Sequence, residues 1–415
     1  MESNAAMATA QNVLFLGGIV LLVGSVIGYV AQKLKVPDIV LFLLAGIVLG
    51  PQLTGVVNVD AQSALNQLIL IFGASYILFE GGVESHLHVM KNVWITLALL
   101  ATVGVLISAL VVAPAAQFVF GIPFLVALLL GSTIAPTDPA TLMPVFKQVT
   151  IKQRVAQTVV SESAFNDATG SIITVTILGL VAGSGGVSLG GSLVHLLEET
   201  GIGVGTGIIL GYLALFLIAH EKMAFLREYM PLVSLMAVIG AYLGAENMQA
   251  SGFMAAFVAG IMLGNRRLFG FTLEEGEQAA LEHFVSTVSL IMRMFIFILL
   301  GSQVKFALLA EHWIGALIVV FVFMFIARPI NVFFCTVIDR GARWTFKEQL
   351  FMCWVRETGV IPAALAGILL GTGAPHAKLI ASVVFVAVLV TIVLQATTTK
   401  LWAAKLGLLE DDPKA

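Results

Sequence analysis

The segment SESAFNDATG, residues 161–170, sets two carboxylates, Glu162 and Asp167, in a run that is otherwise apolar enough to cross a bilayer. Ionisable groups inside a membrane are costly and mark functional sites by default. If the segment is helical, Ser163 and Asp167 lie one turn apart on one face. Glu162 and Asn166 then lie one turn apart on the neighbouring face. The segment therefore predicts a transmembrane helix with four oxygen-bearing side chains along one side.

These oxygen atoms can hold either of two cargoes. Oxygen ligands suit hard cations such as Na⁺, and a carboxylate also accepts a proton. Competition between cation and proton for Asp167 would make an exchanger. The alternative is a carboxylate neutralised by an arginine on the next helix, without transport, and for Glu162 this alternative is the favoured one.

The composition is that of a polytopic membrane protein. Of 415 residues, 59% are apolar and 11% are charged, whereas soluble domains are about 25% charged. Cys335 and Cys353 lie in apolar segments, so we expect neither a disulfide framework nor a zinc site. The sequence has neither the paired aspartates of an intramembrane hydrolase nor a His-Glu-x-x-His motif, so we expect no enzyme activity and no cofactor.

Apolar runs of about 17–25 residues, separated by polar or Gly/Pro-rich segments, predict an all-α fold of about thirteen transmembrane helices. The predicted helices span residues 12–32, 38–50, 64–82, 93–112, 122–146, 154–182, 202–220, 230–246, 250–264, 281–302, 312–337, 349–371 and 378–398. Most Lys and Arg residues then fall on one side of the membrane, and only Lys305 and Lys378 fall on the other. The positive-inside rule places the N-terminus outside and the C-terminus in the cytoplasm.

Two blocks of six predicted helices, at 12–182 and 230–398, flank a connecting helix in a glycine-rich region. A single connector places the blocks in opposite orientations, as an inverted repeat requires. We expect one membrane domain over residues 1–415, in which residues 399–415 form a short cytoplasmic tail.

The predicted fifth helix contains IAPTDPA, residues 134–140. Pro136 and Pro139 each remove a backbone donor and push the preceding residue out of the helical conformation. The helix must therefore unwind, and Asp138 lies where it can cap the second half-helix. The alternative is a simple proline kink, which two prolines around Thr137 and Asp138 make less favoured.

The predicted twelfth helix contains RETGVIP, residues 356–362, in which Gly359 can end one half-helix and Pro362 can begin another. Arg356 would neutralise the negative end of its own half-helix. Each interrupted helix is the fifth of its block. This correspondence points to a midplane binding site between the inverted repeats, at the crossing of the discontinuous helices 5 and 12.

These residues also resemble a known family. APTDP at 135–139, followed by Glu162-Ser163 and Asn166-Asp167, resembles the sodium/proton exchanger branch of the monovalent cation/proton antiporter superfamily, in particular its NhaP-type members. Supporting matches are LLAGIVLGP at 43–51, LFEGG at 78–82, SGFMAAFVAG at 251–260 and ARP at 327–329. The resemblance spans nearly the whole chain.

The resemblance implies a homodimer in the cell membrane, with membrane lipids and monovalent cations as its other partners and no nucleic acid. It also implies two structural units. Residues 12–82 and 202–302 would form a dimerisation domain, and residues 93–182 and 312–398 would form a moving core domain for ion transport.

The resemblance further implies that Asp167 is the central carrier of cation or proton. Asp138, Ser163 and Thr137 would complete a Na⁺ coordination shell. Glu162 would form a buried ion pair with Arg328. Asn166, in place of a second aspartate, resembles the electroneutral branch, in which one cation exchanges for one proton. The candidate ion-binding set is thus Asp167, Asp138, Ser163, Thr137, Asn166 and Glu162.

The chain departs from the family pattern at the twelfth helix, where Gly-Leu-Arg-Gly is common and this chain has WVRETG at 354–359. Glu357 adds a carboxylate near the crossing and leaves the ion preference open, and we expect it to pair with Arg356 and share in charge compensation there. We predict a secondary-active exchanger of Na⁺ or Li⁺ for H⁺ that needs no ATP. The alternative is K⁺/H⁺ exchange at the same site. A cation channel is less favoured because the sequence has no repeated filter-like carbonyl loop.

Overall fold

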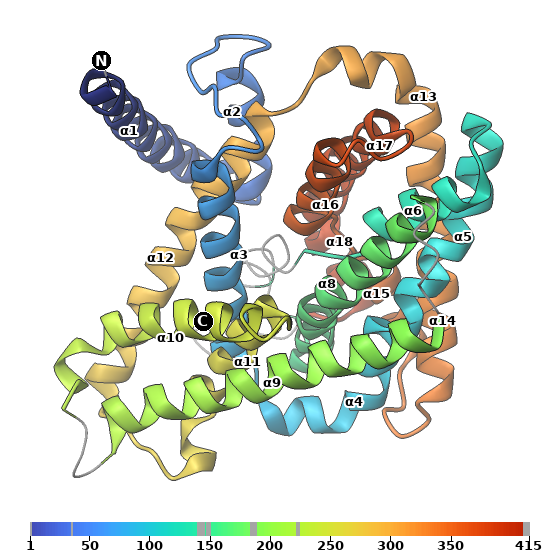
Figure 1. Ribbon diagram of the computed structural model, residues 1–415. Helices are drawn as coiled ribbons and strands as arrows, with labels where there is room; N and C mark the ends of the chain where they lie inside the picture. The colour runs from blue at the N-terminus through green and yellow to red at the C-terminus, as the bar shows by residue number, and fades with distance from the viewer. Residues whose placement is uncertain are drawn as a thin grey trace.

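The structure is a computed structural model that describes residues 2–34, 36–138, 146, 151–182, 189–220 and 225–409 (Figure 1). Within these residues it is helical apart from turns, loops and an isolated antiparallel bridge between Ile151 and Leu409. The apolar runs form helices because lipid offers no partner to backbone N–H and C=O groups, which a helix pairs internally. The predicted all-α membrane fold is confirmed.

The described helices follow one another along the whole chain. They are α1 (Glu2–Leu34), α2 (Asp38–Leu49), α3 (Ala64–Glu84), α4 (Leu87–Ala101), α5 (Val103–Phe120), α6 (Phe124–Ile134), α8 (Gln153–Val181), α9 (Leu189–Ala219), η1 (Arg227–Tyr229), α10 (Met230–Glu246), α11 (Gly252–Gly264), η2 (Arg266–Phe269), α12 (Glu275–Ser302), α13 (Phe306–Val322), η3 (Phe323–Ala327), α14 (Arg328–Ile338), α15 (Phe346–Trp354), α16 (Val360–Gly371), α17 (Ala377–Val390), η4 (Thr391–Ala396) and α18 (Thr397–Leu406).

In the described part of the chain, nine helical stretches are long and apolar enough to cross a membrane. Four shorter apolar helices, α2, α6, α11 and α16, accompany them. The protein is therefore a multi-pass membrane protein. The count of thirteen helices and the inverted repeat stay predictions.

Several predicted helix boundaries differ from the structure. α1, α9 and α12 begin at Glu2, Leu189 and Glu275, before the predicted starts at 12, 202 and 281. The predicted helix 93–112 is a pair, α4 and α5, which meet at Thr102. The predicted helix 378–398 continues through α18, so residues 399–406 of the predicted tail are helical. This part of the helix is packed against the bundle, since Thr399 and Ala403 are buried.

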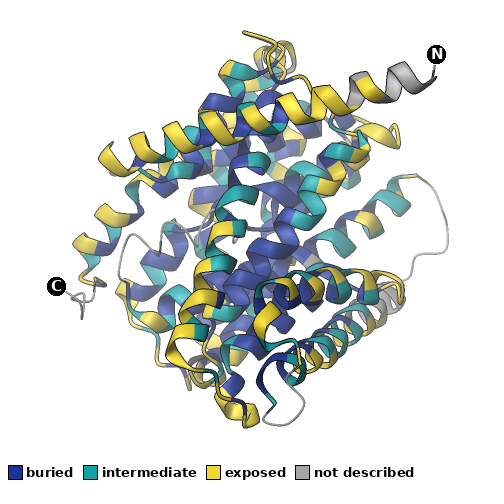
Figure 2. Ribbon diagram, turned by 90° about the vertical axis from the view of Figure 1, so that its left-hand side faces the viewer, coloured by how far each residue is buried: buried dark blue, intermediate teal, exposed yellow. Residues whose placement is uncertain are grey.

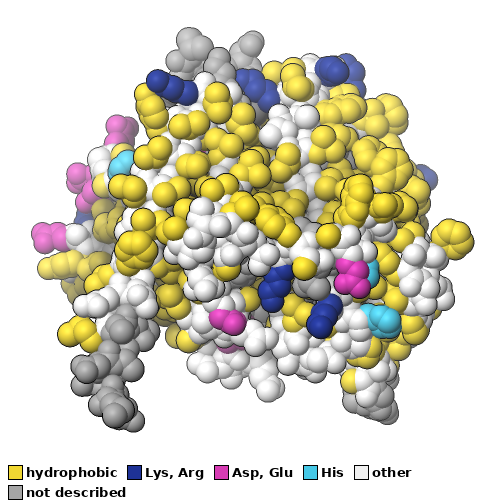
Figure 3. Space-filling view, turned by 90° about the horizontal axis from the view of Figure 1, so that it is seen from above, with side chains coloured by type: hydrophobic (Ala, Val, Ile, Leu, Met, Phe, Trp, Pro, Cys, Tyr) yellow, Lys and Arg dark blue, Asp and Glu magenta, His cyan; other side chains and the backbone are white. Residues whose placement is uncertain are grey.

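The outer surface is largely apolar. Residues coloured as exposed lie mainly on the peripheral helices, whereas residues in the interior of the bundle are buried (Figure 2). Large apolar side chains are among the exposed ones, including Phe118 at 92% and Trp94 at 62%. Seen from above, hydrophobic side chains cover much of the surface, with a few charged ones scattered between them (Figure 3). A surface of this kind is typical of a protein whose solvent is lipid.

One group of packed helices contains α2, α3, α9, α10, α11 and α12. In this group α3 and α11 approach closely, because glycines let their backbones touch. A Cβ at Gly82 would overlap the carbonyl oxygen of Phe257, and a Cβ at Gly260 would overlap that of Phe79. The LFEGG and SGFMAAFVAG motifs therefore serve helix packing, as small residues do between membrane helices.

The second group contains α4, α5, α6, α8 and α13 to α17. α8 packs against α4 and α6, and it also touches α9 and α11 of the first group. Two of the short helices in this group, α6 and α16, end or begin inside the bundle at non-helical segments. The assignment of the two groups as dimerisation and core domains stays a prediction.

Candidate functional site

The two predicted interruptions meet inside the protein. α6 ends at Ile134, and residues 135–138 are not helical. α15 ends at Trp354, residues 355–359 are not helical, and α16 begins at Val360. Residues 139–145, the predicted continuation of the fifth helix, lie outside the described residues.

Asp138 joins the two non-helical segments. Its backbone N–H donates to the Glu357 carbonyl at 2.9 Å, and its Oδ2 accepts from the Val360 N–H at 2.9 Å. Asp138 therefore caps α16 across the crossing. The cap that the sequence predicted on the second half of helix 5 would involve residues outside the described ones and stays a prediction. Gly359 fits against Asp138 because a Cβ at Gly359 would overlap the Asp138 carboxylate. A carboxylate at a helix N-terminus is stabilised by the free N–H groups and the helix dipole.

α8 brings the SESAFNDATG residues to the same crossing. Gly170 allows the close approach, because a Cβ there would overlap the Pro136 ring. The Asn166 side chain clamps Thr137 through two hydrogen bonds. Its Oδ1 accepts from the Thr137 N–H at 3.0 Å, and its Nδ2 donates to Thr137 Oγ1 at 2.8 Å. Thr137 Oγ1 also lies 2.6 Å from Ser163 Oγ.

Asn166 thereby has a positioning role. Both ends of its amide are occupied by Thr137, so in this arrangement it has little left to offer an ion. It holds the backbone of residue 137, which would otherwise leave a buried N–H without an acceptor. The two hydroxyls, of Thr137 and Ser163, remain oxygen donors beside the crossing.

Asp167 is buried next to this cluster, with 2% of its surface exposed. Its Oδ1 has no hydrogen-bond partner in the described part of the chain. Asp138 lies within electrostatic range of it. A buried carboxylate oxygen without a partner is costly, and a cation or a proton would relieve that cost.

Glu162 and Arg328 form a bidentate ion pair on the neighbouring face of α8. Arg328 Nη1 lies 2.5 Å from Glu162 Oε1, and Nη2 lies 2.9 Å from Oε2. Arg328 Nε also donates to the Met352 carbonyl at 2.9 Å. Both side chains are 1% exposed. Since both Glu162 oxygens are engaged, the pair links α8, α14 and α15 and leaves Glu162 little capacity to bind an ion.

Arg356 and Glu357 do not form the local pair that the sequence suggested. The Arg356 guanidinium donates to the Ala135 carbonyl and lies over the Phe323 ring, 4.3 Å from its centroid. It therefore offsets the partial negative charge at the carbonyl end of α6, the other broken helix, and not the one at the end of its own half-helix. Both Glu357 carboxylate oxygens are buried without a hydrogen-bond partner among the described residues.

A second buried charge pair lies outside this site and was not predicted. Arg293 Nη1 lies 3.4 Å from Glu80 Oε2, and Ser289 Oγ donates to the same oxygen at 2.6 Å. The pairing depends on α3 packing beside α12, for which the sequence offers no signal.

Comparison with known proteins agrees with this architecture. The family described as "Sodium/hydrogen exchanger, transmembrane" matches residues 18–405. Na(+)/H(+) antiporter 1 of Methanocaldococcus jannaschii is 33% identical over 358 residues, which cover 84% of this chain and 81% of the relative. The K(+)/H(+) antiporter NhaP of Alkalimonas amylolytica is 29% identical over 385 residues, covering 91% of this chain and 64% of the relative.

A solved structure is similar over almost the entire length. The sodium proton antiporter MjNhaP1 from Methanocaldococcus jannaschii, at pH 8, superimposes with a TM-score of 0.80 at 29% sequence identity. The match covers 96% of this chain and 99% of that one. The fold is therefore shared from end to end.

Proposed function

The chain belongs to the sodium/hydrogen exchanger family, and from this premise we propose that it is a secondary-active antiporter that exchanges Na⁺ or Li⁺ for H⁺ at Asp167. The assignment of Asp167 rests on one observation. The Asp167 carboxylate is buried with an unpartnered oxygen, beside a hydrogen-bonded cluster of Thr137, Ser163 and Asn166.

The neighbouring charges support Asp167 as the group that exchanges its partner. Glu162 is offset by Arg328, and Asp138 is held by the N-terminus of α16. Among the described residues, no cation or helix N-terminus offsets Asp167 in this way, so the proposed role of the cargo is to compensate its charge. Oxygen donors from a carboxylate and hydroxyls suit Na⁺, and Asp167, Asp138, Ser163 and Thr137 are the proposed ligands.

Exchange follows from the cost of carrying charge through a membrane. With either Na⁺ or H⁺ bound, the Asp167 site is locally neutral and can pass between its inward-open and outward-open forms. With neither bound, the bare carboxylate opposes that movement, because an uncompensated charge is expensive in an apolar setting. One cargo must therefore replace the other, and no ATP is needed. Asn166 contributes no second charge, which supports one-for-one, electroneutral exchange.

The proposal extends to assembly and orientation. We propose a homodimer in the plasma membrane. We place its N-terminus outside and its C-terminus in the cytoplasm, because the Lys and Arg distribution follows the positive-inside rule. Exchange of K⁺ for H⁺ is the second candidate, favoured by the match to a K(+)/H(+) antiporter. Oxygen ligands alone do not separate the two ions.

The test is ²²Na⁺ uptake into proteoliposomes under an imposed pH gradient. Asp167→Asn keeps the shape of the side chain and removes its charge, so uptake should fall to the level of empty liposomes. Asp60→Asn is the matched control, because Asp60 lies in the exposed loop between α2 and α3. Uptake by Asp167→Asn equal to that of the control would rule out Asp167 as the residue that carries the cation. Uptake that responds to an imposed membrane potential would rule out one-for-one exchange, and competition by Li⁺ and K⁺ would rank the ions.

A further inference from the structure

A cavity of about 780 Å³ opens at the end of the bundle where α4 and α8 begin and α14 ends. Its wall comes from the start of α4, the start of α8 and the 339–343 part of the loop that joins α14 to α15. In Figure 1, α4 and this loop lie at the lower edge of the molecule. The cavity is separate from the proposed exchange site, and its volume is within the ~300–1,000 Å³ range of ligand pockets.

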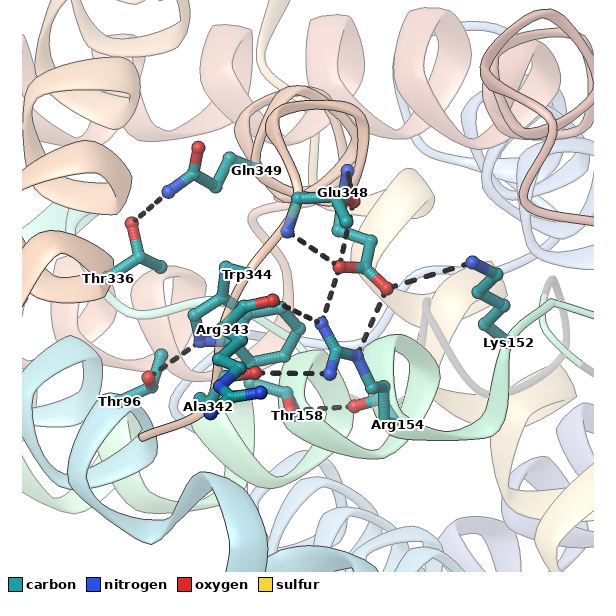
Figure 4. A network of polar contacts seen from close by, with 11 residues as sticks. Thr96, Lys152, Arg154, Thr158, Thr336, Ala342, Arg343, Trp344, Glu348 and Gln349 are labelled. Carbon is teal, nitrogen blue, oxygen red and sulfur yellow. Dashed lines mark hydrogen bonds and ion pairs between the residues drawn. The ribbon is translucent and has the colours of Figure 1, made fainter. Parts of the chain in front are cut away.

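The loop that forms one wall is held firmly. Figure 4 shows the Arg154 guanidinium between the Glu348 carboxylate and the carbonyl groups of Ala342 and Arg343. Arg154 also lies over the Trp344 ring, 4.5 Å from its centroid, and Trp344 Nε1 donates to Thr96 Oγ1 on α4 at 2.8 Å. The loop is therefore tied to α8 and α4 at once, and the wall is part of the folded structure.

The same contacts engage the two described carboxylates of this region, Glu348 and Asp339. Glu348 binds Arg154 through both oxygens, at 3.0 and 2.5 Å, and also accepts from the Thr345 N–H and hydroxyl. Asp339 accepts from Thr96 through Oδ2 and from the Ala342 N–H through Oδ1. Neither carboxylate is left to hold a further cation closely.

Three cationic side chains on the cavity wall are left in excess. Lys91 and Arg343 are exposed and make no ion pair within the described residues. Lys152 is 43% exposed and reaches Glu348 only at 4.0 Å, the longest of that carboxylate's contacts. Arg343 is held with a φ of 48°, a conformation that non-glycine residues rarely adopt. The cavity is therefore a basic pocket, complementary to an anion.

Exposed apolar side chains lie on the elements that form the cavity or flank its loop. Trp94 lies one turn along α4 from Lys91, lines the cavity and is 62% exposed. On the other side, Val337 and Ile338 at the end of α14 and Phe346 at the start of α15 are exposed large apolar residues. Exposed tryptophan next to cationic residues is typical of the membrane interface, where phospholipid phosphates lie.

We propose that this cavity binds the phosphate headgroup of an anionic phospholipid, with Lys91, Lys152 and Arg343 as its cationic contacts and Trp94 against its glycerol and upper acyl region. The bound lipid would bridge α4, α8 and the loop after α14. This site goes beyond the proposed exchange activity and does not depend on it.

The experiment is native mass spectrometry of the detergent-purified full chain titrated with phosphatidylglycerol. Each lost cation near an anionic lipid should weaken binding about fivefold, so Lys91→Gln with Arg343→Gln should weaken it about 25-fold. Lys347→Gln with Lys405→Gln is the matched control, because both lysines are exposed on α15 and α18 and neither lines the cavity. The control pair should bind like the wild type.

Three results would overturn the proposal. These are equal phosphatidylglycerol affinity of the two double variants, equal affinity of the wild type for phosphatidylcholine, and displacement of the lipid by inorganic phosphate at matching concentration. The last result would assign the pocket to a soluble phosphate compound. Because binding is read without transport, failure of this proposal is distinguishable from failure of the exchange proposal, which ²²Na⁺ uptake tests.

Discussion

Replacement of Arg328 tests whether the ion pair with Glu162 organises the centre of the bundle. Arg328→Met keeps the apolar stem of the side chain and removes three hydrogen bonds, two to Glu162 and one to the Met352 carbonyl. Glu162 then remains in a site with 1% exposure and without its cation. Removal of one partner from a buried ion pair costs about 3–5 kcal/mol, so the free energy of unfolding should fall by that amount.

The structure also predicts how adding Glu162→Gln to Arg328→Met changes the free energy of unfolding. Glu162→Gln added to Arg328→Met removes the stranded charge, so the double variant should be more stable than Arg328→Met alone. Buried ion pairs replaced on both sides by uncharged residues are often close to neutral. The coupling between the two sites should therefore be large, as expected for residues in direct contact.

The assay is reversible unfolding in mixed micelles as the share of sodium dodecyl sulfate rises, followed by circular dichroism. Arg227→Met is the control, because Arg227 makes a comparable bidentate pair with Glu277 at 2.6 and 2.8 Å on the surface, with 39% of its side chain exposed. Solvent screens such a pair, so its loss should matter far less. The reasoning is refuted if the two single variants lose equal stability, or if Glu162→Gln destabilises Arg328→Met further.

Two further substitutions test the clamp on residue 137 and the contact between α3 and α11. Asn166→Ala should leave the buried Thr137 N–H without its acceptor and lower stability by about 1–3 kcal/mol. It should also raise the Na⁺ concentration needed for half-maximal exchange in everted vesicles, and an unchanged Na⁺ dependence would contradict the clamp. Gly82→Ala should cost about 1–3 kcal/mol through overpacking against the Phe257 carbonyl. Gly17→Ala on α1 meets open space and should be neutral, so equal unfolding midpoints for these two variants would disprove a packing role for Gly82.

The sequence alone predicted the membrane class, the helical elements and the breaks in two of them. Long apolar runs must form helices in lipid, and the paired prolines at 136 and 139, like Gly359 followed by Pro362, disfavour an uninterrupted one. The segment around Asp167 could also be identified as a candidate functional site, because carboxylates are rare and costly in such apolar runs. These inferences use local chemistry, which does not depend on where the other helices lie.

The partners of the polar groups were decided by the tertiary structure. Asp138 caps α16 across the crossing, Arg356 reaches the Ala135 carbonyl instead of Glu357, and Arg293 pairs with Glu80 across α3 and α12.

The physical reason lies in the solvent. A helix in water reveals its buried face by its hydrophobic stripe, whereas a helix in lipid is apolar on both its packed and its exposed sides. Sequence periodicity therefore carries little information about which helices touch. Only the packed bundle, through contacts such as Gly170 against Pro136, brings α8 to the crossing and sets Asp167 beside it.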